Sequence, residues 1–329
     1  MNAMRITEMK SGTNTKKEKV KPVSFRRKND LRGIAMQENL YFCAEEIAEK
    51  SWMIKNVGHT PAICYLVEGT DYALLIDSIM GIGDLKAFCE TLTPKQIKLV
   101  NTHAHSDHVG GNFHFGHCYM HHRDIGYLQT IIGAKKEDVF KIAKDMAPEN
   151  LRDQIILDSN FKDWDPLRIF PIYDMDEFDL GDRIIEVVEV GGHTAGSVIL
   201  IDHKTKIAYS GDACNSNTLL EFPNSLPVTV YMKSLLRLKE RQSEFNIMYG
   251  GHEIFDPSII DEAIETVAEV IAGTDDKLSA TGMMGTPVLY AKAKNIDGSR
   301  IDGKRFNMSY LPERITGQDS VHQSIRVDG

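Results

Sequence analysis

The chain has 329 residues, of which 42% are hydrophobic and 26% are charged, and its formal net charge is −9. This composition is that of an ordinary globular protein and excludes a fibrous or low-complexity chain. No apolar run approaches the ~20 residues that a membrane span requires, and no segment resembles a secretory signal. The five scattered cysteines form no CxxC pair, which argues against a disulfide framework. We therefore predict a cytoplasmic protein with no membrane partner.

The first 30 residues differ in charge from the rest of the chain. They hold nine basic and three acidic residues, a balance of +6, which leaves −15 for the remainder. Because this segment is also poor in apolar residues, we predict that residues 1–36 form a basic, disordered leader. The acidic remainder argues against nucleic acid as a partner.

The next part of the chain alternates strand-like runs with short polar breaks. The runs are rich in β-branched and aromatic residues. In chain order, we predict strands over 49–56, 61–69 and 72–80, a helix over 81–91, and a strand over 96–102. The last strand leads directly into the sequence THAHSDHVGG. This histidine cluster therefore lies at the carboxyl end of a strand, where folds of helices and strands often place their sites.

Residues 122–180 have a different character and are predicted to form an insertion. A helical pattern covers 134–157, and an aromatic loop with two prolines covers 161–178. Its aromatic side chains would suit a lid or a dimer surface, although we expect most of them to pack within the insertion. They are Tyr127, Phe140, Phe161, Trp164, Phe170, Tyr173 and Phe178.

The second half of the chain repeats the strand-like pattern and ends in an irregular extension. We predict strands over 182–190, 197–202, 206–213 and 246–253, and helices over 230–245 and 256–273. An Asp-Pro pair opens the last helix and Gly273 closes it. Residues 273–329 are glycine-rich, with weak strand signals at 286–293 and 305–311, and we predict that they pack on a main domain over 37–272.

Seven histidines and aspartates recur at the ends of these predicted strands. His103 and His105 lie two residues apart, so on extended backbone both imidazoles project to the same side and can reach one cation. Asp107 and His108 follow where the chain turns, and can face a second cation. The other three each follow a glycine at a strand end; they are His193, Asp212 and His252. Imidazoles with carboxylates and no thiolate suit zinc and tolerate iron or manganese.

These motifs, HAHSDH followed by GGHTAGS, SGDA and GGHE, resemble those of the metallo-β-lactamase superfamily. The resemblance implies an α+β fold, an αββα sandwich of two mixed sheets flanked by helices. It also implies that His103, His105 and His193 bind one divalent metal ion, and that Asp107, His108 and His252 bind a second. In this scheme Asp212 bridges the two ions, and Asp77 lies behind the ligands and holds their loops by hydrogen bonds. A hydroxide shared by the ions would be the nucleophile, oriented by Asp107.

Departures from the family pattern narrow the expected reaction. Asp212 stands where β-lactam hydrolases of this fold usually have cysteine or serine, and Asn215 stands where related lactonases have tyrosine. Our leading hypothesis is a hydrolase of a small-molecule ester, thioester or lactone. A phosphodiesterase, a mononuclear-iron thiol dioxygenase and a non-catalytic metal-binding protein remain as alternatives. The substrate and the possibility of a homodimer are left open by the sequence.

Overall fold

The computed structural model describes residues 26–29, 35–57 and 62–317. Most of the predicted leader lies outside these residues. The two parts of it that are described, 26–29 and 35–36, belong to strands rather than to a disordered segment. These two strands pair with each other, and the second also pairs with the strand that follows it. The backbone hydrogen bonds of these pairings hold the two polar segments in the sheet.

The first sheet contains nine strands that lie side by side in the order of the sequence. The strands are β1 (Arg26–Asn29), β2 (Ala35–Glu38), β3 (Phe42–Ala48), β4 (Ser51–Asn56), β5 (Ile63–Glu68), β6 (Ala73–Ile76), β7 (Ile97–Asn101), β8 (His117–His121) and β9 (Arg168–Ile172). Neighbours are antiparallel up to β6 and parallel from β6 to β9. Parallel neighbours need crossover connections, and α1 (Leu85–Cys89) lies in the first of them.

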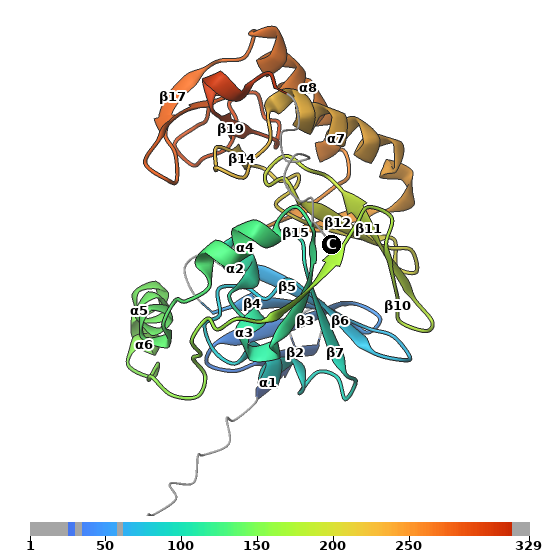
Figure 1. The fold of residues 1–329 in the computed structure, drawn as a ribbon, viewed down its shortest axis with the longest axis vertical. Coiled ribbons are helices and arrows are strands. Elements are labelled where there is room, and N and C mark those ends of the chain that lie inside the picture. Colours follow the sequence, from blue (N-terminus) through green and yellow to red (C-terminus); the bar gives the residue numbers. More distant parts are fainter. Residues whose placement is uncertain (1–25, 30–34, 58–61, 318–329) are drawn as a thin grey trace, which may run out of the picture.

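The second sheet has six strands and is also mixed. They are β10 (Glu177–Asp179), β11 (Ile184–Glu189), β12 (Val198–Asp202), β13 (Ile207–Gly211), β15 (Ile247–Gly250) and β16 (Ile254–Phe255). The pair β13 and β15 is parallel, so the ends of these two strands meet at the same edge of the sheet. The helices α7 (Val228–Glu240) and α8 (Ile259–Ala272) lie on the side of this sheet that faces away from the first sheet (Figure 1).

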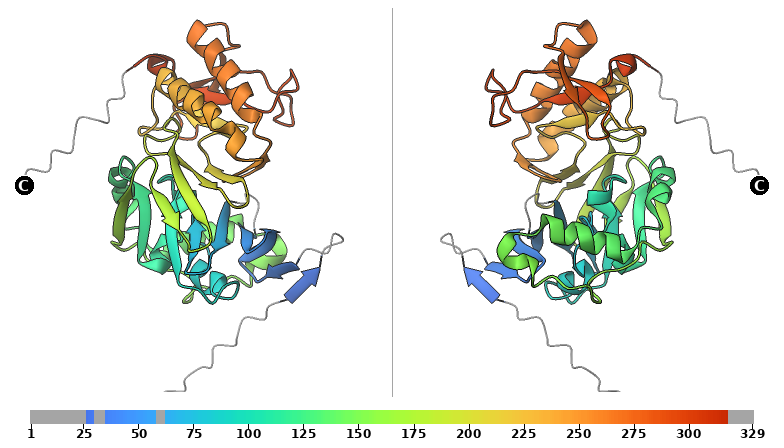
Figure 2. Two further views of the ribbon diagram at one scale, coloured as in Figure 1. Left: turned by 90° about the vertical axis from the view of Figure 1, so that its right-hand side faces the viewer. Right: turned by 90° about the vertical axis from the view of Figure 1, so that its left-hand side faces the viewer.

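Three hydrophobic clusters define the layers of the structure. Successive residues of β4 and β5 point in opposite directions, so Met53 and Tyr65 pack between the two sheets while Ile54 and Cys64 pack toward α1. The third cluster joins the outer face of the second sheet to α7 and α8. The layer order is therefore helices, sheet, sheet, helices, as the two side views in Figure 2 show. The predicted αββα sandwich is confirmed.

The insertion differs in part from its prediction. Its helices are α4 (Ile125–Ile131), α5 (Lys136–Met146) and α6 (Glu149–Arg152). The prediction of a loop over 161–178 is wrong for β9, which pairs in parallel with β8. Pro171 is accepted there because β9 is an edge strand, whose outer side needs no hydrogen-bond donor. The strand β8 itself was not predicted, since its sequence HCYMH carries a histidine at each end.

Residues beyond Gly273 contribute to a third sheet that the sequence did not predict as such. Its strands are β14 (Thr218–Leu220), β17 (Leu278–Thr281), β18 (Pro287–Tyr290) and β19 (Met308–Tyr310). The pairing of β14 with β19 joins the extension to the rest of the chain, and Phe306 and Tyr310 are buried in the cluster with α7 and α8. In the described parts of the chain, no helix is long and apolar enough to cross a bilayer.

A buried arginine connects the two large sheets through an ion pair in one sheet and a hydrogen bond to the other. Arg183, just before β11, donates from Nε to Oδ2 of Asp202 at 2.8 Å, and from Nη2 to Oγ of Ser51 at 2.7 Å. Ser51 opens β4 of the first sheet, whereas Asp202 ends β12 of the second. The side chains of Arg183 and Asp202 are 2% and 0% exposed, so neither charge can be hydrated if its partner is lost.

We expect Arg183→Ala to lower the free energy of unfolding by about 3–5 kcal/mol, because it leaves the Asp202 carboxylate buried without its counter-charge. Urea denaturation followed by circular dichroism measures this change. Lys204→Ala is the control, because Lys204 and Asp182 form a solvent-exposed ion pair in the neighbouring turn and its loss should leave the midpoint nearly unchanged. An Arg183→Ala protein as stable as the Lys204→Ala protein would contradict this account.

Candidate metal centre

The seven side chains singled out from the sequence come from four loops at one edge of the sandwich. His103 and His105 lie between β7 and α2 (Ser106–Val109), and the helix α2 carries the next two. His193 lies in the loop from β11 to β12. Because β13 and β15 are parallel neighbours, the two residues that follow their ends, Asp212 and His252, are placed side by side.

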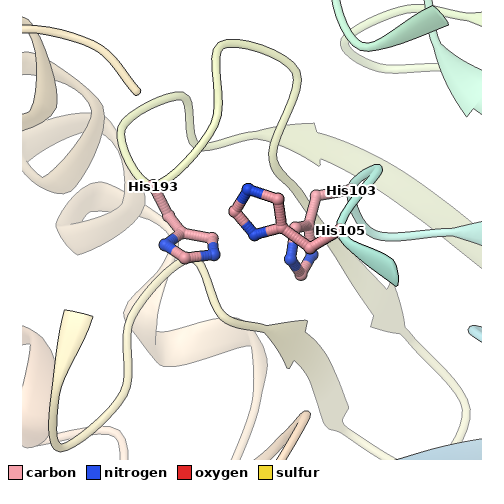
Figure 3. A group of neighbouring side chains, drawn as sticks. All are labelled: His103, His105 and His193. Atoms are coloured by element: carbon pink, nitrogen blue, oxygen red, sulfur yellow. The ribbon is translucent and has the colours of Figure 1, made fainter. Parts of the chain in front are cut away.

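The structure brings all seven side chains together. The nitrogen atoms of His103, His105 and His193 form one group whose donor atoms lie within 4.8 Å of one another. Figure 3 shows these three rings converging from two loops. Asp107, His108 and His252 form a second such group. These are the two groups that were expected to hold separate ions.

Asp212 lies between the two groups. Its Oδ2 atom is 3.8 Å from Nε2 of His193, 3.7 Å from Nε2 of His108 and 3.5 Å from Nε2 of His252. These separations are too long for good hydrogen bonds. They are close to the roughly 3.3–3.4 Å that separates two donors on one tetrahedral zinc ion with bonds of about 2.0–2.1 Å. This spacing fits shared coordination of a cation by neighbouring side chains.

Hydrogen bonds fix which nitrogen of each imidazole carries the proton. The Nδ1 atom of His108 lies 2.8 Å from Oδ2 of Asp77, and Nδ1 of His193 lies 2.9 Å from the carbonyl oxygen of Leu219. Both partners are acceptors, so Nδ1 must be the donor and Nε2 keeps its lone pair. In His103, Nδ1 lies 3.1 Å from Oγ1 of Thr102, whose hydroxyl itself donates to Asp77. The same assignment therefore applies to His103.

The lone pairs that result are buried and have no hydrogen-bond donor. The Nε2 atoms of His103, His105, His108 and His193 are inaccessible to solvent and have no partner among the described residues, and the same holds for Oδ1 of Asp212. Unpartnered polar atoms at this depth are costly unless a ligand satisfies them. Converging imidazole lone pairs and carboxylate oxygens require a cation, so this donor set fits divalent metal ions.

The titration behaviour of the cluster agrees with this donor set. Burial, reinforced by the neighbouring imidazoles, lowers the pKa of His103 and brings the pKa of His105 to about 3. Burial would raise the pKa of Asp212, but the imidazoles of His108 and His252 hold it well below its usual range. Burial would likewise lower the pKa of His252, but its carboxylate neighbours raise it to about 10. Burial would also lower the pKa of His108, but Asp77 and the other nearby carboxylates raise it well above its usual range. Protons on His108 and His252 thus balance the anionic carboxylates, and a divalent cation held by the same atoms would take the place of those protons.

Asp77 supports the cluster from behind. Its Oδ1 and Oδ2 atoms accept hydrogen bonds from the backbone N–H and the hydroxyl of Thr102, each at 2.8 Å, in addition to the bond from His108. Its backbone has a φ of +61°, in the left-handed region that aspartate tolerates better than most residues. The side chain is 3% exposed. This geometry favours the supporting role that was expected for Asp77.

Asp124, which we did not single out from the sequence, connects two of the ligand loops. Its carboxylate accepts bonds from the backbone N–H of Ala104 at 3.0 Å, from the hydroxyl of Thr194 at 2.7 Å and from the backbone N–H of Gly196 at 2.8 Å. Ala104 lies between His103 and His105, and Thr194 follows His193. Burial raises the pKa of Asp124, while these hydrogen bonds oppose the shift. The sequence offers one feature by which Asp124 could have been identified: it is an acidic residue immediately before the helix α4.

The glycines beside the ligands are required by close packing. A Cβ atom on Gly251 would lie 2.4 Å from Cε1 of His108 and 2.8 Å from Oδ1 of Asp212. Neither ligand could move without leaving the cluster. The small residue next to His252 therefore allows the β15 strand end to approach the other loops, as expected from the repeated GGH and SGD sequences.

A cleft with a volume of about 530 Å³ opens at the ligands. Its floor includes His105, Asp107 and His252, and one ring of its wall, Phe222, lies 4.4 Å from the His105 ring between centroids. The other apolar side chains of the wall are Tyr127, Ile131, Leu219, Met283 and Met284. Among the aromatic residues of the insertion, only Tyr127 lines this cleft; Phe161, Trp164 and Phe178 are buried in hydrophobic clusters. These rings are buried as core residues, but they pack with the main domain and not only within the insertion: Phe161 contacts Tyr41 and Trp164 stacks on Phe113.

Two side chains that follow Asp212 differ in their relation to the cleft. Cys214, two residues after Asp212, is fully buried in the cluster with α7 and α8, and burial raises the pKa of its thiol to about 12. Asn215 lines the cleft at the position where related lactonases carry tyrosine. The cleft therefore has no thiolate or phenol at these two points.

Comparisons with known proteins agree with this arrangement. The model of the Metallo-beta-lactamase superfamily matches residues 57–282. The acyl-coenzyme A thioesterase MBLAC2 of Homo sapiens is 24% identical over 200 residues, and the match covers 54% of this chain and 66% of that protein. This chain thus spans just under two thirds of that relative's length.

Two solved structures show the same fold. The structure of TMB-1 gives a TM-score of 0.51 at 16% identity, and the match covers 70% of this chain and 98% of TMB-1. The inverting sec-alkylsulfatase Pisa1 from Pseudomonas sp. gives a TM-score of 0.50 at 14% identity, covering 70% of this chain and 42% of that one. At these identities the likeness concerns the fold alone.

We expect Asp124→Ala to weaken zinc binding by about 10–100-fold, the usual effect of losing a residue that orients metal ligands. Competition with a chromophoric chelator measures the affinity. Asp163→Ala is the matched control, because Asp163 also accepts a backbone hydrogen bond, from Lys136, but lines no part of the centre. Equal zinc affinities for the two variants would show that Asp124 does not position the ligand loops.

Proposed function

The chain belongs to the metallo-beta-lactamase superfamily, and from this premise we propose that it is a metal-dependent hydrolase of thioesters. The observation that carries the proposal is the convergence of buried, unpartnered Nε2 atoms at the floor of a cleft with apolar walls. The donors provide the electrostatic centre for hydrolysis, and the walls provide a site for an acyl chain. The name of the relative MBLAC2, an acyl-coenzyme A thioesterase, supports the choice of thioester.

The proposed centre holds two divalent ions, with zinc as the first choice. His103, His105 and His193 would hold one ion and Asp107, His108 and His252 the other, with Asp212 available to both. When bound, such ions would lower the pKa of a bound water and polarise the carbonyl under attack. The donor set alone also accommodates iron or manganese.

The side chains in and behind the cleft have different proposed roles in hydrolysis. Asp107 is the ligand with the most open carboxylate, 31% exposed, and its Oδ2 lies 3.4 Å from Nε2 of His252. It is placed to orient the attacking water and to accept its proton at Oδ2. A thiol is a good leaving group, so departure of the sulfur needs no strong general acid. Asp212, Asp77 and Asp124 keep the ligands in position during the reaction.

The walls of the cleft favour an acyl substrate over a small phosphodiester. Phe222, Leu219, Ile131 and the two adjacent methionines line the same cleft as the candidate ligands. Met283 and Met284 are 76% and 63% exposed, and flexible thioethers of this kind adapt to apolar chains of varied shape. A small-molecule substrate is therefore proposed, and the cytoplasmic location and the homodimer stay predictions.

We expect protein purified without added metal to contain about two zinc ions per chain by elemental analysis. Removal of the metal with a chelator should abolish hydrolysis of an acyl thioester, and zinc should restore it. His103→Ala should reduce kcat/KM by about hundredfold or more, since even loss of a residue behind a ligand costs about 10–100-fold. Hydrolysis that persists after complete metal removal would overturn the proposal.

Parallel assays separate the alternatives that the sequence left open. The same protein is tested with a chromogenic phosphodiester and, in an oxygen electrode, with a thiol substrate. One iron per chain together with oxygen uptake would favour the thiol dioxygenase and would remove the bridging role of Asp212. Turnover of the phosphodiester alone would favour the phosphodiesterase.

A change in the apolar wall tests the position of the acyl chain. We expect Met284→Asp to reduce kcat/KM about tenfold for a twelve-carbon acyl thioester and far less for a four-carbon one, because each buried methylene contributes about 0.8 kcal/mol. Met175→Asp is the control, because Met175 is 72% exposed and lies outside the cleft. An equal loss with both chain lengths would place the acyl chain elsewhere.

A further inference from the structure

A second pocket opens next to the metal cleft and is built mainly by the C-terminal extension. It has a volume of about 640 Å³, and most of its lining comes from residues 294–307. Three residues, Ser216, Asn217 and Glu253, line both this pocket and the metal cleft, so the two spaces adjoin. The segment that matches the superfamily model ends at residue 282, so the extension's part of this pocket lies outside it.

The lining of this pocket is basic although the chain as a whole is acidic. Four cationic side chains face two carboxylates there, in a chain with a net charge of −9. The cations are Lys294, Arg300, Lys304 and Arg305, and the carboxylates are Glu253 and Asp297. Unlike the walls of the metal cleft, this lining has almost no apolar side chain, with Ile301 as its one aliphatic member.

Two of these cations have structural partners. Arg300 is 4% exposed; its guanidinium pairs with Asp302 and donates to Thr266 at 3.0 Å. Lys304 pairs with Glu265 on α8. These two residues hold the extension against the body of the protein.

Of the other two cations, Arg305 has a long, solvent-exposed pairing with Glu253, whereas Lys294 has no carboxylate partner within the described residues. Within the described residues, Lys294 forms no ion pair with a carboxylate; its Nζ donates to Oδ1 of Asn217 at 3.0 Å and lies 4.2 Å from the centre of the Tyr290 ring. Arg305 is held over Phe255 and lies 3.5 Å from Glu253, with its side chain 51% exposed. A half-buried ammonium without a carboxylate partner favours an anionic ligand.

We propose that this pocket binds the phosphate groups of a thioester's carrier, while the acyl chain lies in the apolar cleft and the thioester lies over the metal ligands between them. The substrate class is then an acyl thioester of a phosphorylated nucleotide thiol, of which coenzyme A is the example. This proposal rests on the thioesterase function and specifies the half of the substrate that the metal cleft does not accommodate. Asn217, shared by both pockets and hydrogen-bonded to Lys294, lies where the two halves meet.

The test compares two thioesters that carry the same octanoyl group, octanoyl-coenzyme A and S-octanoyl-N-acetylcysteamine, which has no phosphate. We expect the full-length protein to prefer the first, and Lys294→Glu to reduce the ratio of the two kcat/KM values by about tenfold to hundredfold, the range for a hydrogen bond to a charged group. Lys294→Gln, which retains a donor for Asn217 but no charge, should give an intermediate ratio.

Lys233→Glu provides the matched control. It makes the same charge reversal on the exposed face of α7 and lines neither pocket, so the ratio should stay within about twofold of the unchanged protein. A ratio that falls equally in the Lys233→Glu and Lys294→Glu proteins, or in neither, would overturn the proposal.

A binding measurement separates failure of this pocket from failure of the proposed function. Isothermal titration with adenosine 3′,5′-bisphosphate requires no catalysis, and we expect binding that weakens about tenfold or more in Lys294→Glu. Such binding without turnover of any thioester would refute the thioesterase function and support the pocket. Hydrolysis of both thioesters with equal efficiency, and no bisphosphate binding, would refute the pocket and leave the thioesterase function standing.

Discussion

The direction of the imidazole lone pairs is the constraint on which the rest of the site depends. His103, His108 and His193 each use Nδ1 for a hydrogen bond to the protein, so their Nε2 atoms point inward without donors. A group of lone pairs at this depth is costly to bury and favours a cation among them. The buried carboxylates of Asp77 and Asp124, the close approach at Gly251 and the loops at the strand ends all serve to maintain this arrangement.

The cleft joins two parts of the chain with different tasks. Residues at the sheet edges form the candidate metal centre, and all of them lie within the segment that matches the superfamily. The apolar wall and the basic pocket are built by α4, by the region around β14 and by the extension after Gly273. The proposed chemistry therefore resides in loops at the sheet edges, while part of the proposed selectivity for a substrate resides in the extension beyond residue 282, outside the segment that matches the superfamily.

The sequence identified side chains that the fold brings into one cluster, and it identified the sandwich, but it missed parts of the frame around the cluster. All seven ligand candidates could be identified because each stands at a strand end beside a small residue, and this local pattern is visible in the sequence. Asp124 could not be identified, because its three partners come from loops that only the folded chain brings together. The strand β9 was mistaken for a loop, since Pro171 is tolerated only at the edge of a sheet, and edge position is a property of the whole fold.

The order of strands in the first sheet affects the stage of folding at which the proposed metal ions could bind. All nine strands lie in the order of the sequence, so most of the pairings in this sheet are between near neighbours and can form early during folding. The donor atoms, however, are divided between loops of the first sheet and loops of the second. Neither sheet alone presents a complete set, so the proposed ions would bind tightly only after the two layers have docked. On the proposed function, metal loading would follow assembly of the sandwich and would stabilise chains that have already assembled it.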